Sequence, residues 1–100
     1  MSGTYTLKRS PRFGKKWRII TPQGENVDFG ASGYSDYTKH KNYERKERYV
    51  KRHQKRENWS KTGISTAGFW SRWLLWNLPS LTDSIKDIEA KFNIKIQYKA

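Results

Sequence analysis

The chain has 100 residues, no cysteine and a formal net charge of +12, and 34% of its residues are hydrophobic while 15% are aromatic. A chain of this length forms one small domain, so a few large rings must supply most of its core, and missing thiols exclude disulfides, thiol catalysis and thiolate metal sites. The charge exceeds what solubility needs and predicts attraction to a polyanion or to an acidic protein surface.

Residues 1–14 are predicted to form a basic arm outside the domain. Residues 1–18 carry six basic side chains and no acid, and Pro11 and Gly14 interrupt any regular pattern. The arm is either a solvated tail or a segment that orders against an anionic or protein partner. The N-terminus lacks the apolar segment of a signal peptide and no run approaches the ~20 apolar residues of a membrane span, so we expect a soluble protein of a reducing, intracellular compartment.

Residues 15–30 show the pattern of a β-hairpin. Trp17 and Ile19 alternate with basic neighbours, and Val27 and Phe29 resume the alternation. Between them, residues 21–24 read Thr-Pro-Gln-Gly, which is typical of a tight turn. We therefore expect two antiparallel strands joined by this turn.

Two helical segments follow the hairpin. Residues 34–40 predict a short turn or helix capped by Ser35 or Asp36, and Asn42 is expected to cap a second helix that runs to about Arg56. The i, i+4 spacing of two Glu residues before basic residues supports this second helix, with the expected pairs Glu44 with Arg48 and Glu47 with Lys51. Its less polar stripe consists of Tyr43, Lys46, Tyr49, Val50 and His53.

The stretch from residue 66 to residue 79 is the most apolar part of the chain. Read as a helix capped by Thr66 and stopped by Pro79, it places Phe69, Trp73 and Trp76 on one stripe. We expect this helix over residues 66–77 to centre the core. Truncating Trp73 to alanine should then cost about 3–5 kcal/mol.

The last 20 residues predict a helix followed by a strand. Ser80 and Asp83 resemble a capping box, an amphipathic helix follows over residues 80–92, and Asn93 can end it in the left-handed conformation. Alternating apolar residues at 94–98 predict a strand that pairs with the early hairpin. The chain is therefore expected to form one α+β domain over residues 15–100. The predicted core residues are Trp17, Phe29, Phe69, Trp70, Trp73, Leu74, Trp76, Leu81, Ile85, Ile88 and Phe92.

The sequence shows no pattern of catalysis or metal binding. It has two histidines, His40 and His53, at a spacing that does not align them on a helix, and its nine acidic residues are scattered. It has neither a nucleophile motif nor a phosphate-binding loop. We therefore expect no enzymatic activity, no metal and no cofactor.

Basic residues are concentrated in two segments. Residues 39–61 hold ten Lys or Arg residues against three Glu residues, and the N-terminal segment adds six more. This charge is either a solvated surface or a contact with an anionic partner. Aromatic residues among the basic ones, such as Trp17, Tyr43, Tyr49 and Trp59, are used for stacking by single-strand binders, although a small aromatic core explains them more simply. The cations predicted to contact an anionic partner, called the candidate cations below, are Lys8, Arg9, Arg12, Lys15, Lys39, Lys41, Arg45, Arg48, Lys51, Arg52, Lys55 and Arg56.

Several short motifs occur between Lys16 and Phe92, namely Asp28-Phe-Gly, Gly33-Tyr-Ser-Asp-Tyr-Thr, His40-Lys, Glu44-Arg-Lys, Arg48-Tyr, Arg52-His, Arg56-Glu, Trp59 and Gly68-Phe-Trp-Ser-Arg-Trp-Leu-Leu-Trp-Asn. Together they resemble an uncharacterised family of small basic proteins encoded by large eukaryotic double-stranded DNA viruses and some algae. Members often have Asp-Pro where this chain has Asn42-Tyr43. Asparagine can still cap the helix, so only the preorganisation of the helix start by proline is lost. The family has no assigned activity, so no catalytic residue is implied.

The resemblance implies a virion as the setting, after synthesis in the host cytoplasm. We expect a non-enzymatic structural protein of a large DNA virus particle, a minor capsid protein that cements major capsid subunits through basic arms that order on contact. The alternative is a sequence-independent nucleic-acid-binding protein that is packaged with the viral genome or acts on it, through the DNA or RNA phosphate backbone. Neither function needs a membrane span.

Overall fold

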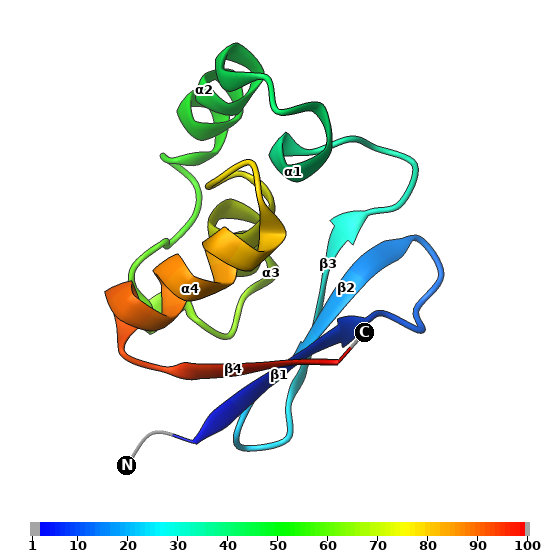
Figure 1. Ribbon diagram of the computed structural model, residues 1–100, viewed down its shortest axis with the longest axis vertical. Coiled ribbons are helices and arrows are strands. Elements are labelled where there is room, and N and C mark those ends of the chain that lie inside the picture. The colour runs from blue at the N-terminus through cyan, green and yellow to red at the C-terminus, as the bar shows by residue number, and fades with distance from the viewer. Residues whose placement is uncertain (1–2, 100) are drawn as a thin grey trace.

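The computed structural model describes residues 3–99, which form a four-stranded sheet with helices on one face (Figure 1). The strands are β1 (Thr4–Arg9), β2 (Lys15–Ile20), β3 (Asn26–Ala31) and β4 (Lys95–Lys99), in the spatial order β3-β2-β1-β4. β2 is antiparallel to both neighbours, whereas β4 runs parallel to β1. The expected α+β class is confirmed.

The predicted hairpin is present as β2 and β3. Trp17 lies opposite Phe29 and Ile19 lies opposite Val27, and all four side chains are buried. At the turn, the Gly24 N–H donates to the carbonyl oxygen of Thr21 at 2.9 Å. The alternation of apolar residues thus reports the buried face of this half of the sheet.

The prediction of a basic arm over residues 1–14 is wrong for residues 4–9, which form the interior strand β1. Leu7 is fully buried opposite Ile19, and residues 10–14 make the turn into β2. The alternation in β1 is short, because only Tyr5 and Leu7 are apolar and the next inward position is Arg9, so the strand signal in the sequence is weak. Because β1 separates β2 from β4, the last strand joins the hairpin only through β1, and the prediction that it pairs directly with the hairpin is also wrong. Residues 1 and 2 of the predicted arm lie outside the described residues.

The two predicted helices after the hairpin are α1 (Tyr37–His40) and α2 (Tyr43–His53). The caps are Asp36, whose carboxylate accepts from the Thr38 N–H at 3.0 Å, and Asn42, whose side chain accepts from the Arg45 N–H at 3.2 Å. α2 ends at residue 53 rather than near residue 56. Of its predicted stripe only Tyr49 is buried, and Tyr43 is exposed.

The aromatic segment begins where predicted but does not continue as a regular α-helix. Thr66 caps α3 (Ala67–Trp70), and residues Ser71–Leu75 form a π-helical turn. A π-turn bonds i to i+5 and so rotates the following side chains relative to an α-helix. Trp70 and Leu74 enter the core, while Trp73 and Trp76 are only half-buried, which corrects the prediction that these two rings form the core with Phe69.

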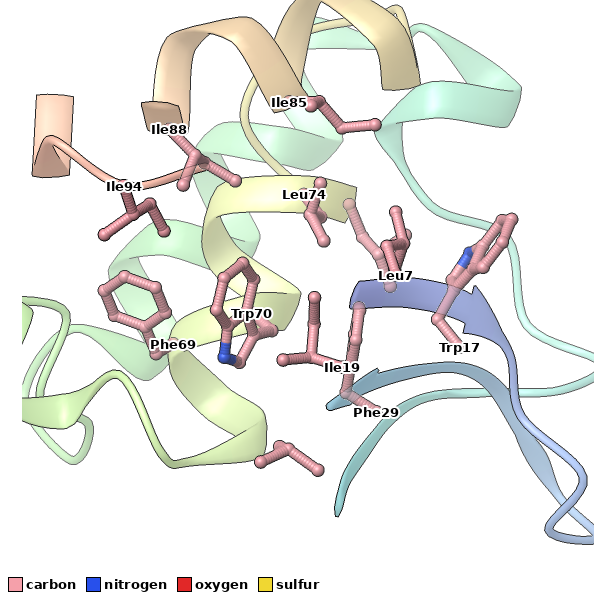
Figure 2. Packing of buried hydrophobic residues seen from close by; sticks show 12 residues of the cluster. Leu7, Trp17, Ile19, Phe29, Phe69, Trp70, Leu74, Ile85, Ile88 and Ile94 are labelled. Atoms are coloured by element: carbon pink, nitrogen blue, oxygen red, sulfur yellow. The ribbon is translucent and has the colours of Figure 1, made fainter. Parts of the chain in front are cut away.

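The core lies between the sheet and the segments α3 and α4 (Leu81–Phe92) (Figure 2). As predicted, Ser80 caps α4 and Asn93 ends it with φ 55°. In Figure 2, Trp70 lies between Phe69 and the strand residue Ile19. The predicted core residues all belong to this cluster, but Trp73, Trp76, Leu81 and Phe92 lie half-buried at its edge, and Leu7, Ile19, Val27, Leu75 and Ile94 complete it. No helix within residues 3–99 is long and apolar enough to cross a membrane.

Candidate functional site

Two acidic side chains, Asp28 and Asp36, stabilise the fold through ion pairs with basic residues of β2. The Asp28 carboxylate accepts from the Arg18 Nε at 2.8 Å and from the Ser10 hydroxyl at 2.7 Å, and the hydrogen bonds from Arg18 lower the pKa of Asp28. The Lys16 ammonium lies 2.7 Å from the Asp36 carboxylate, which is 3% exposed. Asp28 and Asp36 are therefore neutralised locally.

The candidate cations differ from these paired residues. Within residues 3–99, none of the twelve forms an ion pair with a carboxylate inside 4.0 Å. Lys41 is still tied into the fold, because its ammonium donates to the carbonyl oxygens of Thr38 at 3.1 Å and Pro79 at 2.8 Å. The structure leaves the other candidate cations as positive charge on the surface.

Three candidate cations from two parts of the chain meet at one groove, which we call the turn groove. Arg9 and Lys15 come from the strands beside the β1–β2 turn, and Lys39 comes from α1. The turn groove has a volume of about 590 Å³ and is also lined by residues 32–36 of the β3–α1 loop. The sequence does not predict this meeting of residue 39 with the N-terminal segment.

The walls of the turn groove are ordered by specific contacts. The Ser32 N–H donates to the carbonyl oxygen of Gly14 at 2.9 Å and so joins the two loops. The Arg9 guanidinium lies over the Trp17 ring at 5.0 Å, which favours one orientation of this cation. The only acid in the groove wall, Asp36, is neutralised by Lys16, so the net charge along the wall is positive.

Two exposed aromatic side chains were not predicted as site residues, one in the wall of the turn groove and one on the turn between the two strands that contribute to it. Phe13, at the tip of the β1–β2 turn, is completely exposed, and Tyr34 in the groove wall is 74% exposed. The signal available in the sequence was an aromatic residue next to a turn glycine and among cations, as in Arg-Phe-Gly-Lys at residues 12–15.

A second basic area lies on the sheet face that the helices leave open. Lys8 sits between Arg18 of β2 and Lys99 of β4, its partners in register, and Arg18 is neutralised by Asp28. A hollow of about 430 Å³ at this place is lined by Lys8, Lys99 and also Arg9. Arg9 therefore connects the open face to the turn groove.

The remaining candidate cations lie on or just after α2. Arg45, Arg48 and Arg52 have the spacing i, i+3, i+7, which places them along one flank of the helix, here called the arginine ridge. The predicted ion pairs of Glu44 with Arg48 and of Glu47 with Lys51 are not formed in the described structure. The Glu47 carboxylate instead accepts from the Tyr43 hydroxyl at 3.2 Å, which raises the pKa of Tyr43. Lys51, Lys55 and Arg56 are exposed beside the arginine ridge.

Three of the aromatic residues that lie between cations in the sequence, Trp17, Tyr49 and Trp59, are at least half-buried. Tyr49 is buried and stacks on Trp76 with ring centroids 4.5 Å apart and planes 3° apart. Trp59 packs under the Arg72 guanidinium, which also lies over Trp73 at 4.5 Å. Burial lowers the pKa of Arg72. These rings support the fold, and the aromatic side chains that are more than half exposed among residues 3–99 are Phe13, Tyr34 and Tyr43.

The two histidines do not form part of a metal-binding cluster. The His40 Nδ1 accepts from the Asn42 N–H at 2.9 Å, and the His53 Nδ1 lies 2.5 Å from the Glu57 carboxylate. Among residues 3–99 no three His, Cys, Asp or Glu side chains come together in a way that could hold a metal ion.

The fold and the surface define a small α+β domain in which Asp28 and Asp36 are paired with bases, while most of the candidate cations are exposed and none of them has a carboxylate partner within residues 3–99. Residues 5–53 match the family model described as "Family of unknown function (DUF5754)". No curated protein and no solved structure matches the chain. The matched segment runs from β1 to the end of α2, so it contains every candidate cation except Lys55 and Arg56, and it leaves out the aromatic segment 66–77.

Proposed function

We propose that this protein binds nucleic acid without sequence preference, through contacts of its exposed cations with phosphate groups. The observation that carries the proposal is the separation of charge: acids such as Asp28 and Asp36 are paired inside the domain, while the candidate cations have no carboxylate partner in the described structure. Exposed, unpaired cations on a rigid domain attract a polyanion, and they release its counterions on binding.

The arrangement of the cations supports contact with the phosphate backbone of a nucleic acid. The arginine ridge places three guanidinium groups along one flank of α2, and the turn groove gathers Arg9, Lys15 and Lys39 from separate elements. Arginine suits phosphate because its planar fork donates two hydrogen bonds at once. Like-charged neighbours at i, i+3 and i, i+4 also destabilise a helix by a few tenths of a kcal/mol each, and an anionic partner removes this repulsion.

A minor capsid protein, the function that the sequence favours, depends on basic arms that are free to order on contact. Residues 4–9 are the interior strand β1, so this part of the argument is lost and the charge alone remains. Surface charge without an arm favours a long polyanion over several neighbouring protein subunits. The nucleic-acid proposal therefore takes precedence.

The test is a titration of fluorescent mixed-sequence DNA and RNA with the protein at several salt concentrations. We expect the logarithm of the binding constant to fall linearly with the logarithm of salt concentration. Replacing Arg45, Arg48 and Arg52 by glutamine should weaken binding to all sequences alike and reduce the salt slope by about 2–3, because each lost phosphate contact contributes about 0.7–0.9 to it.

The matched control changes the same amount of charge elsewhere. Lys61, Lys86 and Lys95 are exposed and are not candidate cations, so replacing these three by glutamine should change the slope by less than 1. Equal losses in the two triple variants would mean that only net charge matters. That result, or no binding at low salt, would contradict the proposal.

A further inference from the structure

We propose that the turn groove binds unpaired nucleotides, with their phosphate groups on Arg9, Lys15 and Lys39 and their bases stacked on Tyr34 and Phe13. The protein therefore prefers single-stranded nucleic acid. This inference rests on the proposed nucleic-acid binding and adds the strand type and the place of contact.

The size and charge of the turn groove fit this ligand. Its volume of about 590 Å³ lies within the range of about 300–1,000 Å³ that is usual for small-ligand sites. Four cations line it, and one of them, Lys16, neutralises the carboxylate of Asp36 in its wall at 2.7 Å, which leaves three without a carboxylate partner. A phosphate in the groove would meet positive charge from β1, β2 and α1.

Tyr34 lines the turn groove, and Phe13 lies on the turn between the two strands that supply cations to it. The hydrogen bond from the Ser32 N–H to the Gly14 carbonyl joins the loop that carries Tyr34 to the turn that carries Phe13. Gly14 and Gly33 have φ values of 88° and 87°, a backbone conformation that favours glycine, and each directly neighbours one of the rings. The turns are therefore well defined at the two positions that present the aromatic side chains.

The exposure of the rings favours single strands. Phe13 and Tyr34 contribute little to the core, since one is completely exposed and the other is 74% exposed. A flat ring beside cations matches an unpaired chain, in which bases and phosphates alternate and each base can leave its neighbours to stack on a side chain. In a duplex the bases are already paired and stacked, so the same rings have no face to bind.

The experiment compares single and double strands in the variant Phe13→Ala, Tyr34→Ala. We expect its affinity for a fluorescent oligothymidine to fall by about 5-fold or more, which is the usual loss when a side chain that stacks on a base is replaced by alanine. Its affinity for a duplex of equal length should stay within about 2-fold of the wild-type value. Phe13→Trp and Tyr34→Phe should retain single-strand binding. Because both side chains are exposed, the melting temperature should not change.

The matched control is Tyr43→Ala, which removes an exposed ring on α2 outside the turn groove. It should leave both affinities unchanged. Binding that persists with no difference between strand types, or that Phe13 and Tyr34 do not affect, would overturn this inference and leave the proposed function standing. Absence of binding to any nucleic acid would overturn both.

Discussion

The two long helices of this domain differ in what attaches them. α4 places Ile85 and Ile88 in the core and buries Ser84 completely, with the Ser84 hydroxyl accepting from the Leu78 N–H at 3.2 Å. α2 is almost as long but has one buried residue, Tyr49, which stacks on Trp76. In Figure 1, α4 runs across the body of the molecule, whereas α2 lies at its upper end, away from the sheet.

This difference indicates that the two helices have different roles, one in stabilising the core and the other in carrying surface charge. Burial of apolar area stabilises α4 together with the sheet, because the two share one core. α2 gains little from burial and carries the arginine ridge, whose like charges repel one another. We infer that α2 presents charge and opens at a lower free energy than the core does.

The largest expected effect comes from the core that α4 shares with α3 and the sheet. Trp70→Ala removes a fully buried ring and should lower the free energy of unfolding by about 3–5 kcal/mol. Trp73→Ala should cost clearly less, since that ring is half-buried against Phe92. Urea denaturation of the two variants checks the order, and an equal or larger loss for Trp73→Ala would contradict the placement of the π-helical turn.

Tyr49→Ala should release α2 without unfolding the core. The expected loss is about 1–3 kcal/mol, the usual gain from burying one such side chain. Hydrogen exchange should accelerate at residues 43–53 while the strands stay protected. If protection is lost uniformly across the chain, α2 and the core form one cooperative unit and the comparison fails.

The two helix caps provide a matched pair of smaller changes. Ser80→Ala removes the side chain that accepts from the Asp83 N–H, and Asn42→Ala removes the one that accepts from the Arg45 N–H. Each should cost about 1 kcal/mol. The Ser80 change should lower the global denaturation midpoint, whereas the Asn42 change should appear mainly as faster exchange in α2. The reverse pattern would contradict the lower stability of α2.

The smallest effect expected is a pH dependence at the start of α2. Burial lowers the pKa of His40, with help from the charge of Arg45 and against that of Asp36. In the unfolded chain, His40 takes up a proton once the pH falls below about 6.5, the usual pKa of histidine, whereas in the folded chain it takes up the proton only at a lower pH. The stability that is present at pH 7 is therefore lost as the pH falls through the folded pKa.

Denaturation midpoints at pH 7 and pH 5 measure this effect. Wild type should lose more stability between the two than His40→Asn, whose amide oxygen can still accept from the Asn42 N–H. Asp28, whose pKa is lowered, contributes above its unfolded value of about 4 and so lies outside this window. An unchanged difference in the variant would show that another group causes the pH dependence.

Local chemistry in the sequence determined the helix starts, the hairpin and the types of residue that carry charge. Asp36, Asn42, Thr66 and Ser80 cap their helices as predicted, because a cap depends on residues only two or three positions away. The hairpin likewise follows from alternation and one turn. The candidate cations could be named for the same reason, since charge is a property of each residue alone.

The tertiary structure decided what depends on distant partners. β1 is a strand because β2 and β4 flank it, and its own six residues carry too weak an alternation to show this. The π-helical turn exists where Trp70 and Leu74 must fit against the sheet, which no local preference encodes. The turn groove brings residue 39 beside residues 9 and 15 only because the β3–α1 loop folds back on the β1–β2 turn. Sequence patterns report interactions between near neighbours, whereas a sheet order, a packed π-turn and a groove arise from contacts between residues far apart in the chain.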